Sequence, residues 1–336
     1  MKLILRISTI PLMITFLQDL KEGKASTDQL ADLFHHPDYL FEFSRYGVPV
    51  DDTIIEYFFR LNRMNEANIP ELSSERKNML KDKHQLWLRA YENPQKYRVL
   101  YDDIMGFATE ENIQAVIKRC KNGLPNGVDL GDVNIISTMS IGMSFGYVFD
   151  NALHFDMMQL NDIADLLPLI AHETHHLAMW RFVSTFIDEL TLEERYIFSF
   201  SGEGLAIKFC NNAQGRFSKA IDSGAPVNEG LDAFSMDYLN SRFDQDWVIF
   251  EQTLADIHTG KMTKDDVFEQ LNAYWWNPYT EEQSKGDRPL LKQSKMYTFG
   301  NDLYGSIYDA FGKEALFDCI RHPRKAVECF RSIHKV

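Results

Sequence analysis

Cysteine is scarce in this sequence, with four residues among 336 and no Cys-x-x-Cys pair. A chain of this length can bury a sizeable core without disulfide bonds, so buried thiols are expected rather than a disulfide-rich scaffold. Among Cys120, Cys210, Cys319 and Cys329, only the last two are close enough in sequence to suggest a pair, and only if the protein is exported. The cysteines therefore do not indicate the cellular compartment of the protein.

Positive charge is also in short supply. The chain carries 35 Lys and Arg against 49 Asp and Glu, for a formal net charge of -14. Tracking of nucleic-acid phosphates and adsorption to anionic lipid both need basic patches. We therefore expect no nucleic-acid partner and no binding to an anionic membrane surface.

Long apolar runs are absent, since no stretch reaches the roughly 20 residues that a membrane-spanning helix requires. The segment Met1–Arg6 begins like a signal peptide, but Arg6 interrupts the apolar run and no small-x-small cleavage site follows Leu20. We read it as mature chain without a signal peptide, which favours the cytoplasm. With 45% hydrophobic and 25% charged residues and no low-complexity tract, the composition is that of a globular protein.

The most informative segment that is present reads His172-Glu173-Thr174-His175-His176, the pattern His-Glu-x-x-His within an apolar stretch. At about 100° per residue, positions i and i+4 share one helix face, so His172 and His176 can direct ring nitrogens toward one ion. Glu173 lies beside that face, where it can deprotonate a metal-bound water whose pKa zinc lowers from about 15.7 to about 7. The pattern predicts one zinc ion and a hydrolytic enzyme.

A catalytic zinc usually takes three protein ligands, and the next helix offers Glu203 as the third. From His176 to Ile187, and again from Leu192 to Glu203, the chain advances 11 residues, or about 17 Å of helix. Two antiparallel helices would therefore return Glu203 to the level of His176. The alternative is an exposed Gly-Glu-Gly turn with a solvated glutamate.

Local signals agree with this second helix. Thr191 and Glu194 form a predicted capping box at its start, and the helix is expected to continue through Phe198 into the segment that holds Glu203. Gly202 and Gly204 would remove side-chain bulk between the two helices. A carboxylate can then approach the pair of histidines.

The predicted secondary structure divides the chain into three regions. Residues 1–125 are mainly helical, with start signals such as Ser26 with Gln29. Residues 126–215 open with strand-like segments near 133–136, 147–149 and 153–156 and continue into the metal-binding helices. Residues 216–336 are helical, with Thr263 opening one helix. We expect one compact unit of the α+β class that is predominantly helical.

The motifs around His172, Glu173, His176 and Glu203 resemble the gluzincin branch of the HExxH metallopeptidases, and within it an uncharacterised bacterial family of zinc-dependent peptidases. The resemblance rests chiefly on residues 133–210. It implies a zincin-like catalytic core, made of a small sheet, the HExxH helix and the glutamate-ligand helix, with helical N- and C-terminal additions. One departure is Ile207, where thermolysin-like gluzincins carry an aspartate four residues after the glutamate ligand. Their specificity is not carried over.

The expected function is that of a zinc-dependent peptidase that hydrolyses a peptide or protein substrate with a metal-bound water activated by Glu173. A donor for the developing oxyanion is sought in Tyr297 or His154. His175 is read as a packing residue rather than a ligand, and Asp150, Asp156 and Asp162 are the acids that could orient the ligands.

Two alternatives stay open. One is a non-catalytic or degenerate zinc-binding protein of the same fold, in which the ion only clamps two helices. The other is a di-iron helical protein, because Glu173 and His176 also match Glu-x-x-His. That fold needs a second such motif, and no other Glu in the chain has a His three residues later.

Overall fold

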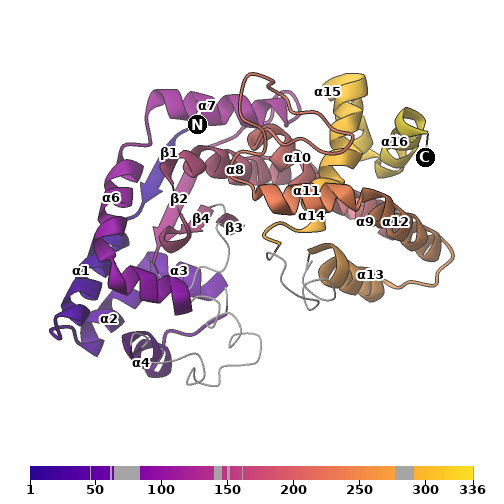
Figure 1. The fold of residues 1–336 in the computed structure, drawn as a ribbon. Coiled ribbons are helices and arrows are strands. Elements are labelled where there is room, and N and C mark those ends of the chain that lie inside the picture. Colours follow the sequence, from indigo (N-terminus) through magenta and orange to yellow (C-terminus); the bar gives the residue numbers. More distant parts are fainter. Residues whose placement is uncertain are drawn as a thin grey trace. The chain divides into compact units, whose positions relative to one another are not determined.

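The computed structural model describes residues 1–45, 47–60, 63, 84–139, 146–149, 152–160, 162–276 and 291–335. Helices predominate in these ranges, and one small sheet accompanies them (Figure 1). This agrees with the expected α+β class. None of the helices in the described ranges combines the length and apolarity that a membrane crossing requires.

The described chain groups into two compact units. The first consists of Met1–Gln114 with Gly131–Leu167, and the second of Ala115–Leu130 with Pro168–Val336. Neither unit is a single continuous segment. The grouping does not test the predicted division into regions 1–125, 126–215 and 216–336, which stays a prediction.

The first unit contains a four-stranded sheet in the order β1-β2-β4-β3. Strands β1 (Leu3–Arg6), β2 (Val133–Thr138) and β4 (Ala152–Asp156) run parallel, while β3 (Gly146–Phe149) pairs with β4 in the antiparallel sense. In this register Leu3 lies opposite Val133, Asn134 opposite Ala152, and Gly146 opposite Phe155. The sequence predicted β2, β3 and β4, but it did not predict β1.

Helices α1 and α3 pack against β2, and Figure 1 shows them with α6 beside the sheet. Ser26 and Gln29 form the predicted capping box at the start of α2. Residues 84–92 are also helical. The bounds of the named helices and turns of this unit are α1 Thr9–Lys21, α2 Thr27–Phe34, α3 Pro37–Arg45, α4 Asp52–Arg60, α6 Pro94–Met105, η3 Met157–Gln159 and η4 Ile163–Asp165.

The second unit consists of helices and connecting loops, with no strand among its described residues. It begins within α7 (Glu110–Asn122) and resumes within α8 (Leu166–Val183), since its boundaries fall inside both helices. The others are η5 Ile187–Glu189, α9 Leu192–Ser199, α10 Ser201–Cys210, α11 Ala233–Ser241, α12 Phe243–His258, α13 Lys264–Gln270, η6 Leu271–Trp276, α14 Lys295–Gly300, η8 Asn301–Gly305, α15 Ser306–Arg321 and α16 Pro323–His334.

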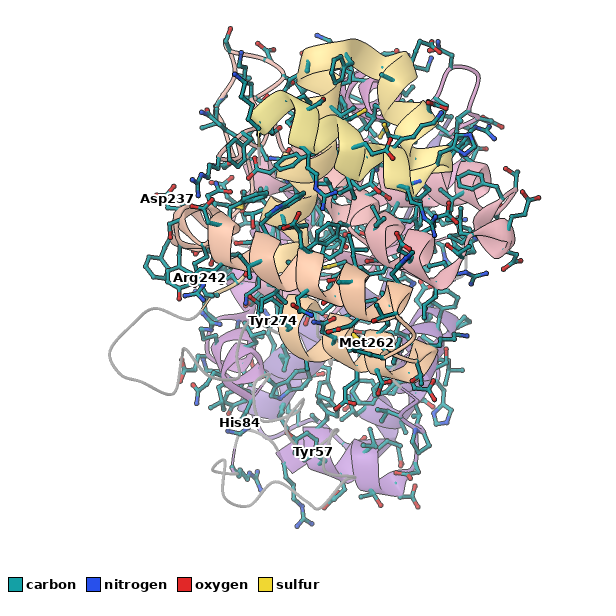
Figure 2. All side chains as sticks on the ribbon, turned by 90° about the vertical axis from the view of Figure 1, so that its right-hand side faces the viewer. Tyr57, His84, Asp237, Arg242, Met262 and Tyr274 are labelled. Atoms are coloured by element: carbon teal, nitrogen blue, oxygen red, sulfur yellow. The ribbon has the colours of Figure 1, made fainter. Side chains whose placement is uncertain are left out.

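An aromatic cluster forms the core of this second unit. The Phe200 ring centroid lies 4.6 Å from that of Trp275 and 4.9 Å from that of Phe299, and both rings are buried. Tyr274, labelled near α12 in Figure 2, donates a hydrogen bond to Asp246 Oδ1 at 2.6 Å and so attaches the π-helical turn η6 to α12. Trp275 is buried in this core, whereas the neighbouring Trp276 is exposed, and residues 277–279 lie outside the described residues.

Two predictions about the helices were wrong. Helix α8 ends at Val183 rather than near Ile187, and the predicted helix after Thr191 is two helices, α9 and α10, with Phe200 between them. Glu203 accordingly lies in the first turn of α10 rather than deep inside a long helix. The capping box of Thr191 and Glu194 is present as predicted.

Candidate metal centre

Helix α8 carries both histidines of the motif within a buried stretch. Pro168 is its third residue, and because the first four N–H groups of a helix have no intrahelical acceptor, proline causes no kink there. Leu169, Ile170, Ala171 and Leu177 are all buried. A helix that is apolar on every side is held by its surroundings rather than by one amphipathic face.

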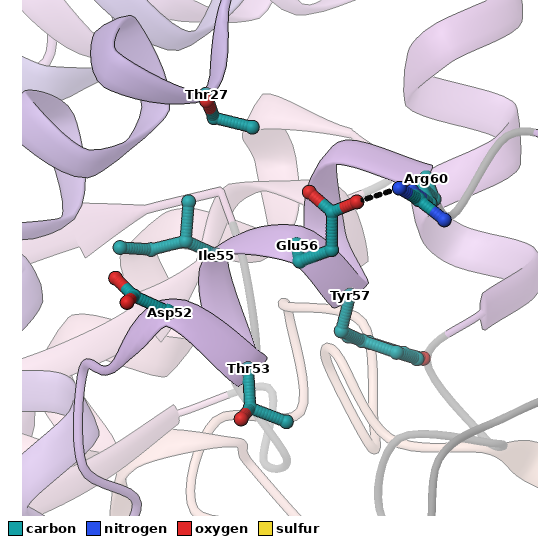
Figure 3. Close-up of a pocket in the computed structure, with 7 residues that line it drawn as sticks. All are labelled: Thr27, Asp52, Thr53, Ile55, Glu56, Tyr57 and Arg60. Carbon is teal, nitrogen blue, oxygen red and sulfur yellow. Dashed lines mark ion pairs between the residues drawn. The ribbon is translucent and has the colours of Figure 1, made fainter.

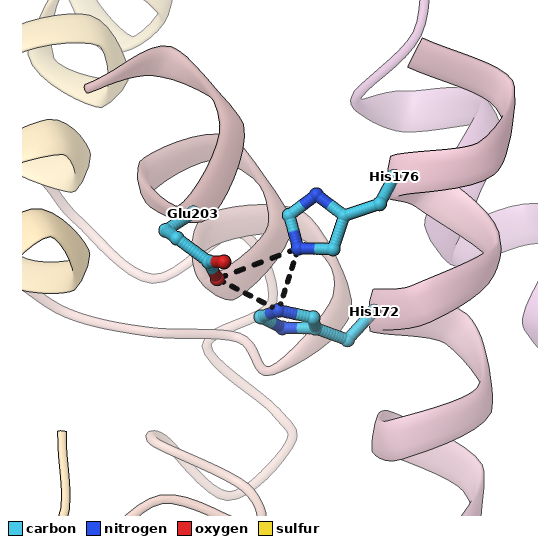
Figure 4. A group of neighbouring side chains, drawn as sticks. All are labelled: His172, His176 and Glu203. Carbon is cyan, nitrogen blue, oxygen red and sulfur yellow. Dashed lines mark hydrogen bonds and ion pairs between the residues drawn. The ribbon is translucent and has the colours of Figure 1, made fainter. Parts of the chain in front are cut away.

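Helix α10 brings Glu203 to the same place, and Figure 4 shows the three side chains pointing toward one another from two helices. His172 Nε2 lies 3.0 Å from Glu203 Oε2 and 3.0 Å from His176 Nε2, and His176 Nε2 lies 3.4 Å from Glu203 Oε2. Within the described ranges, this is the one group of three or more potential metal-ligating side chains with converging ligand atoms. The three residues are the ones that the sequence motifs single out.

The spacing of these atoms fits a zinc ion. Tetrahedral zinc binds nitrogen and oxygen at about 2.0–2.2 Å, which separates its ligand atoms by about 3.3–3.6 Å. The observed separations of 3.0, 3.0 and 3.4 Å differ from this by only a few tenths of an ångström. Two imidazoles and one carboxylate are also a donor set that zinc accepts, and three protein ligands leave a fourth position for water or substrate.

Charges in the cluster are strongly coupled. Burial acts against the imidazolium form of His172, but the hydrogen bond and charge of Glu203 outweigh it and raise the His172 pKa to about 9. Burial likewise acts to raise the pKa of Glu203, but the charges and hydrogen bonds of His176 and His172 hold that pKa well below its usual range. A partly buried carboxylate so placed attracts positive charge, which either protons or a metal cation can supply.

Glu173 is buried, with 6% of its surface exposed, and follows the first histidine of the cluster directly. Its negative charge contributes to the raised pKa values of His172 and Tyr297, which places it within electrostatic reach of both. A buried carboxylate next to a cluster histidine in the sequence is a suitable group for proton transfer.

Asn211, immediately after α10, orients the first histidine. His172 Nδ1 donates a hydrogen bond to Asn211 Oδ1 at 2.8 Å. With its proton held at Nδ1, the neutral ring keeps the lone pair of Nε2 directed at the cluster. Sequence reasoning missed Asn211, although a signal exists: it follows Glu203 by eight residues and so falls within about 80° of it around the helix axis.

Two of the acids proposed for that orienting role accept hydrogen bonds from the local backbone. Asp156 Oδ1 accepts a hydrogen bond from Met158 N at 2.9 Å, and Asp162 Oδ1 accepts one from Ala164 N at 2.9 Å, so both cap short 3-10 turns of the first unit. Asp150 lies outside the described residues.

His175 has a structural contact. It is fully buried, and its Nε2 donates a hydrogen bond to the carbonyl of Gly123 at 2.8 Å. Burial lowers its pKa to about 3, so the ring is neutral at physiological pH. A Cβ on Gly123 would come within 2.5 Å of the Phe209 ring, which explains glycine at that position.

Of the two candidate oxyanion donors, Tyr297 lies at the cluster. Its ring stacks on that of His172 with centroids 5.9 Å apart. Burial, and then the charges of Glu203 and Glu173, raise its pKa well above 10, so the hydroxyl stays protonated. His154 belongs to β4 in the first unit, where its ring stacks on Phe41 at 4.7 Å, and its oxyanion role stays a prediction.

A close backbone contact explains why Tyr297 reaches the cluster. A Cβ on Gly204 would lie 2.1 Å from the backbone of Gly300, and a Cβ on Gly300 would lie 2.0 Å from the carbonyl oxygen of Phe200. Helices α10 and α14 therefore meet with almost no space between their backbones. The predicted reason for these glycines, an approach of α10 to α8, was wrong for Gly204, while Gly202 has its nearest contact at His176 Cε1, 4.0 Å away.

A surface pocket elsewhere lacks comparable chemistry. The one in Figure 3 is lined by Thr27 and by residues of α4, among them Glu56 and Arg60, which form an ion pair one helical turn apart. Exposed pairs of this kind contribute little to stability or binding. Neither histidine nor cysteine lines the pocket, and we assign it no function.

The model of a family described as "Putative zinc dependent peptidase (DUF5700)" matches residues 30–335, nearly the whole chain. Searches among curated proteins and among solved structures gave no match.

Proposed function

The chain belongs to the family described as "Putative zinc dependent peptidase", and on this premise we propose that it hydrolyses peptide bonds with one zinc ion held by His172, His176 and Glu203. The observation that carries the proposal is the convergence of three ligand atoms at separations of 3.0 to 3.4 Å, with the buried Glu173 beside them. The pairing of the HExxH helix with a glutamate-bearing helix supports a zincin-like core of the gluzincin type.

Zinc bound there would supply Lewis acidity, which makes water a better nucleophile and polarises the scissile carbonyl. Glu173 would take the proton of the attacking water and pass it to the leaving amine. Tyr297, kept protonated by its raised pKa, would donate a hydrogen bond to the carbonyl oxygen as negative charge develops on it.

The test is the variant Glu173→Gln. Glutamine keeps the shape of the side chain but cannot accept the proton, so hydrolysis should fall at least about 100-fold while zinc is retained. Hydrolysis is best followed by mass spectrometry on a complex peptide mixture, which presumes no cleavage specificity, and zinc by elemental analysis.

Three outcomes separate the possibilities. Loss of cleavage with retained zinc supports the peptidase. Unchanged cleavage in Glu173→Gln contradicts the assigned mechanism. A wild-type protein that holds one zinc per chain and cleaves nothing in the mixture favours the non-catalytic alternative.

A further inference from the structure

The segment from Asn211 to Asp232, between α10 and α11, is a compact loop with joined ends. Glu229 N donates a hydrogen bond to the Asn211 carbonyl at 2.9 Å, and Asn228 N donates one to the Asn212 carbonyl at 3.3 Å. Compact loops whose ends are close and whose interior is filled by their own groups are often functional. We call residues 211–232 the neck loop, because it closes beside the metal cluster.

The neck loop is fixed from within by Asn212. Its side-chain amide donates to the carbonyls of Asp222 at 2.9 Å and Pro226 at 3.0 Å, and its Oδ1 accepts from Asp222 N at 2.9 Å. Asn212 adopts a φ of +48°, a left-handed conformation that asparagine tolerates better than most residues. These bonds hold the part of the loop that follows the metal-orienting Asn211.

A second anchor comes from η8. The buried carboxylate of Asp302 accepts hydrogen bonds from the backbone N–H groups of Arg216, Phe217 and Ser218 at 3.1, 2.7 and 2.9 Å. The loop therefore has a defined conformation over its first eight residues.

Asn211 joins the loop to the metal cluster through both ends of one amide. Its Oδ1 accepts from His172 Nδ1 at 2.8 Å, and its Nδ2 donates to the Glu229 carbonyl at 2.7 Å. Because the amide is planar, a rotation that breaks one of these bonds also breaks the other. Arg119 links Glu229 to the end of α10, because it donates hydrogen bonds to Glu229 Oε2 at 2.8 Å and to the Cys210 carbonyl at 2.6 Å.

We propose that Asn211 is a positioning residue that couples zinc affinity to the order of the neck loop. Closing of the loop fixes the amide, and the amide fixes the His172 ring with Nε2 toward Glu203. By linkage, zinc must stabilise the closed loop by the same free energy by which the closed loop strengthens zinc binding. This inference rests on the proposed zinc site, but it does not require the protein to be a peptidase.

Two substitutions at one position separate the two bonds of the amide. Asn211→Leu removes both bonds at similar volume, and zinc affinity should fall about 10- to 100-fold, the range typical of lost ligand-orienting partners. Asn211→Asp keeps an acceptor for His172 but loses the donor to Glu229, so zinc affinity should fall less than in Asn211→Leu while amide exchange at 212–229 accelerates. Affinity is measured by competition with a chromophoric chelator, and exchange by mass spectrometry with and without zinc.

One further variant and its control test the coupling itself. Asn212→Gly keeps the left-handed backbone and removes three hydrogen bonds from the loop without touching a metal ligand. It should weaken zinc binding severalfold. Thr263→Ala is the control, since it removes a capping box from α13 and lowers stability without altering the loop or zinc affinity.

The results distinguish this inference from the proposed function. If wild-type protein binds no zinc, or binds it equally after His176→Ala, the zinc site itself is wrong. If the wild type binds zinc at this site and Asn211→Leu or Asn212→Gly binds it as tightly, the coupling is wrong and the site stands. Equal weakening by Asn211→Leu and Asn211→Asp would also contradict the role of the amide.

Discussion

At the scale of single residues, Tyr297 gives the most direct test of transition-state stabilisation. Its ring stacks on His172, and its hydroxyl has a pKa well above 10, so it can donate a hydrogen bond throughout the neutral range. Tyr297→Phe should lower kcat about 10²- to 10³-fold with little change in KM, because the lost bond forms fully only in the transition state. Steady-state kinetics on one cleaved peptide measures this.

Zinc content provides the control for Tyr297→Phe, since the hydroxyl is not a proposed ligand. Equal zinc in the variant and the wild type attributes the lost rate to the missing donor. A kcat within threefold of the wild type would remove Tyr297 from the mechanism.

A second prediction at this scale concerns His154 and acid. Burial, with the charges of Arg6 and Arg45, lowers its pKa to about 3 from an ordinary value near 6.5. Between these pH values the unfolded chain binds more protons than the folded chain, so stability is lost as pH falls below 6.5 and is constant above it. Each such histidine contributes a slope of at most about 1.4 kcal/mol per pH unit.

His154→Gln should reduce the slope of the free energy of unfolding against pH by up to about 1.4 kcal/mol per pH unit, the contribution of one proton. Urea unfolding between pH 4.5 and 8, with a chelator present to exclude metal, gives the free energy of unfolding at each pH. Slopes are compared rather than absolute stabilities, because the substitution also alters packing on Phe41. The same slope in both proteins would contradict the assignment.

The residues of the candidate site could be predicted from sequence to very different degrees. His172, Glu173 and His176 lie within one helical turn, and Glu203 follows at a distance that helix geometry can bridge. Tyr297 could only be proposed among alternatives. It follows Glu203 by 94 residues, and its position next to the cluster depends on how α14 packs against α10. Asn211 was missed because an asparagine at a helix end ordinarily indicates only a cap.

At the scale of elements, the contact of α10 with α14 is the critical one. Gly204→Ala would place a Cβ 2.1 Å from the Gly300 backbone, and no side-chain rotation can relieve that overlap. We expect a loss of about 1–3 kcal/mol or more in the free energy of unfolding. Thermal and urea unfolding of the metal-free protein measure it.

The neighbouring glycine supplies a matched control. A Cβ on Gly202 would meet only His176 Cε1, at the ordinary contact distance of 4.0 Å. Gly202→Ala should therefore be neutral or stabilise α10 by up to about 1 kcal/mol through helix propensity. Equal destabilisation by both substitutions would show that the close backbone contact is not what makes Gly204 necessary.

Helix starts were the predictable part of the elements, because a cap is local. The boxes at Ser26, Thr191 and Thr263 appear as their sequences indicate. Departures from α-helical geometry were not predictable. The π-helical turn η8 separates α14 from α15, and the hydroxyl of Tyr304 in this turn donates a hydrogen bond to the Ile197 carbonyl at 3.1 Å.

At the scale of the whole molecule, the second unit depends on a segment from the first half of the chain. Residues 115–130 supply Arg119, which binds Glu229 and the Cys210 carbonyl, and Gly123, which accepts the hydrogen bond of His175. A fragment that begins at Pro168 lacks these partners. It should bind zinc at least about 10-fold more weakly than the full chain, although it contains all three proposed ligands.

Rejoining the missing segment tests the reason for that loss. Residues 115–130 attached through a flexible linker to the fragment 168–336 should restore part of the zinc affinity, as measured by chelator competition. A fragment 168–336 that alone equals the full chain would show that the inserted segment does not support the metal site.

The fold class was accessible from sequence because composition, helix caps and three short strands all indicated a mainly helical α+β protein. The grouping into two discontinuous units was not, since two of its three boundaries lie inside α7 and α8, where the sequence shows no linker. Glycine, proline and polar tracts indicate a domain boundary only when the chain crosses it as a loop.

Helices α10 and α14, which meet in the fold, are synthesised almost a hundred residues apart. The three proposed ligands are translated by residue 203, while Tyr297 and Gly300 follow almost a hundred residues later. At about 5–20 residues per second, this interval lasts roughly 5–20 s. A chain still on the ribosome would thus have its proposed zinc ligands before it has the tyrosine, so metal binding can precede the arrival of the proposed oxyanion donor.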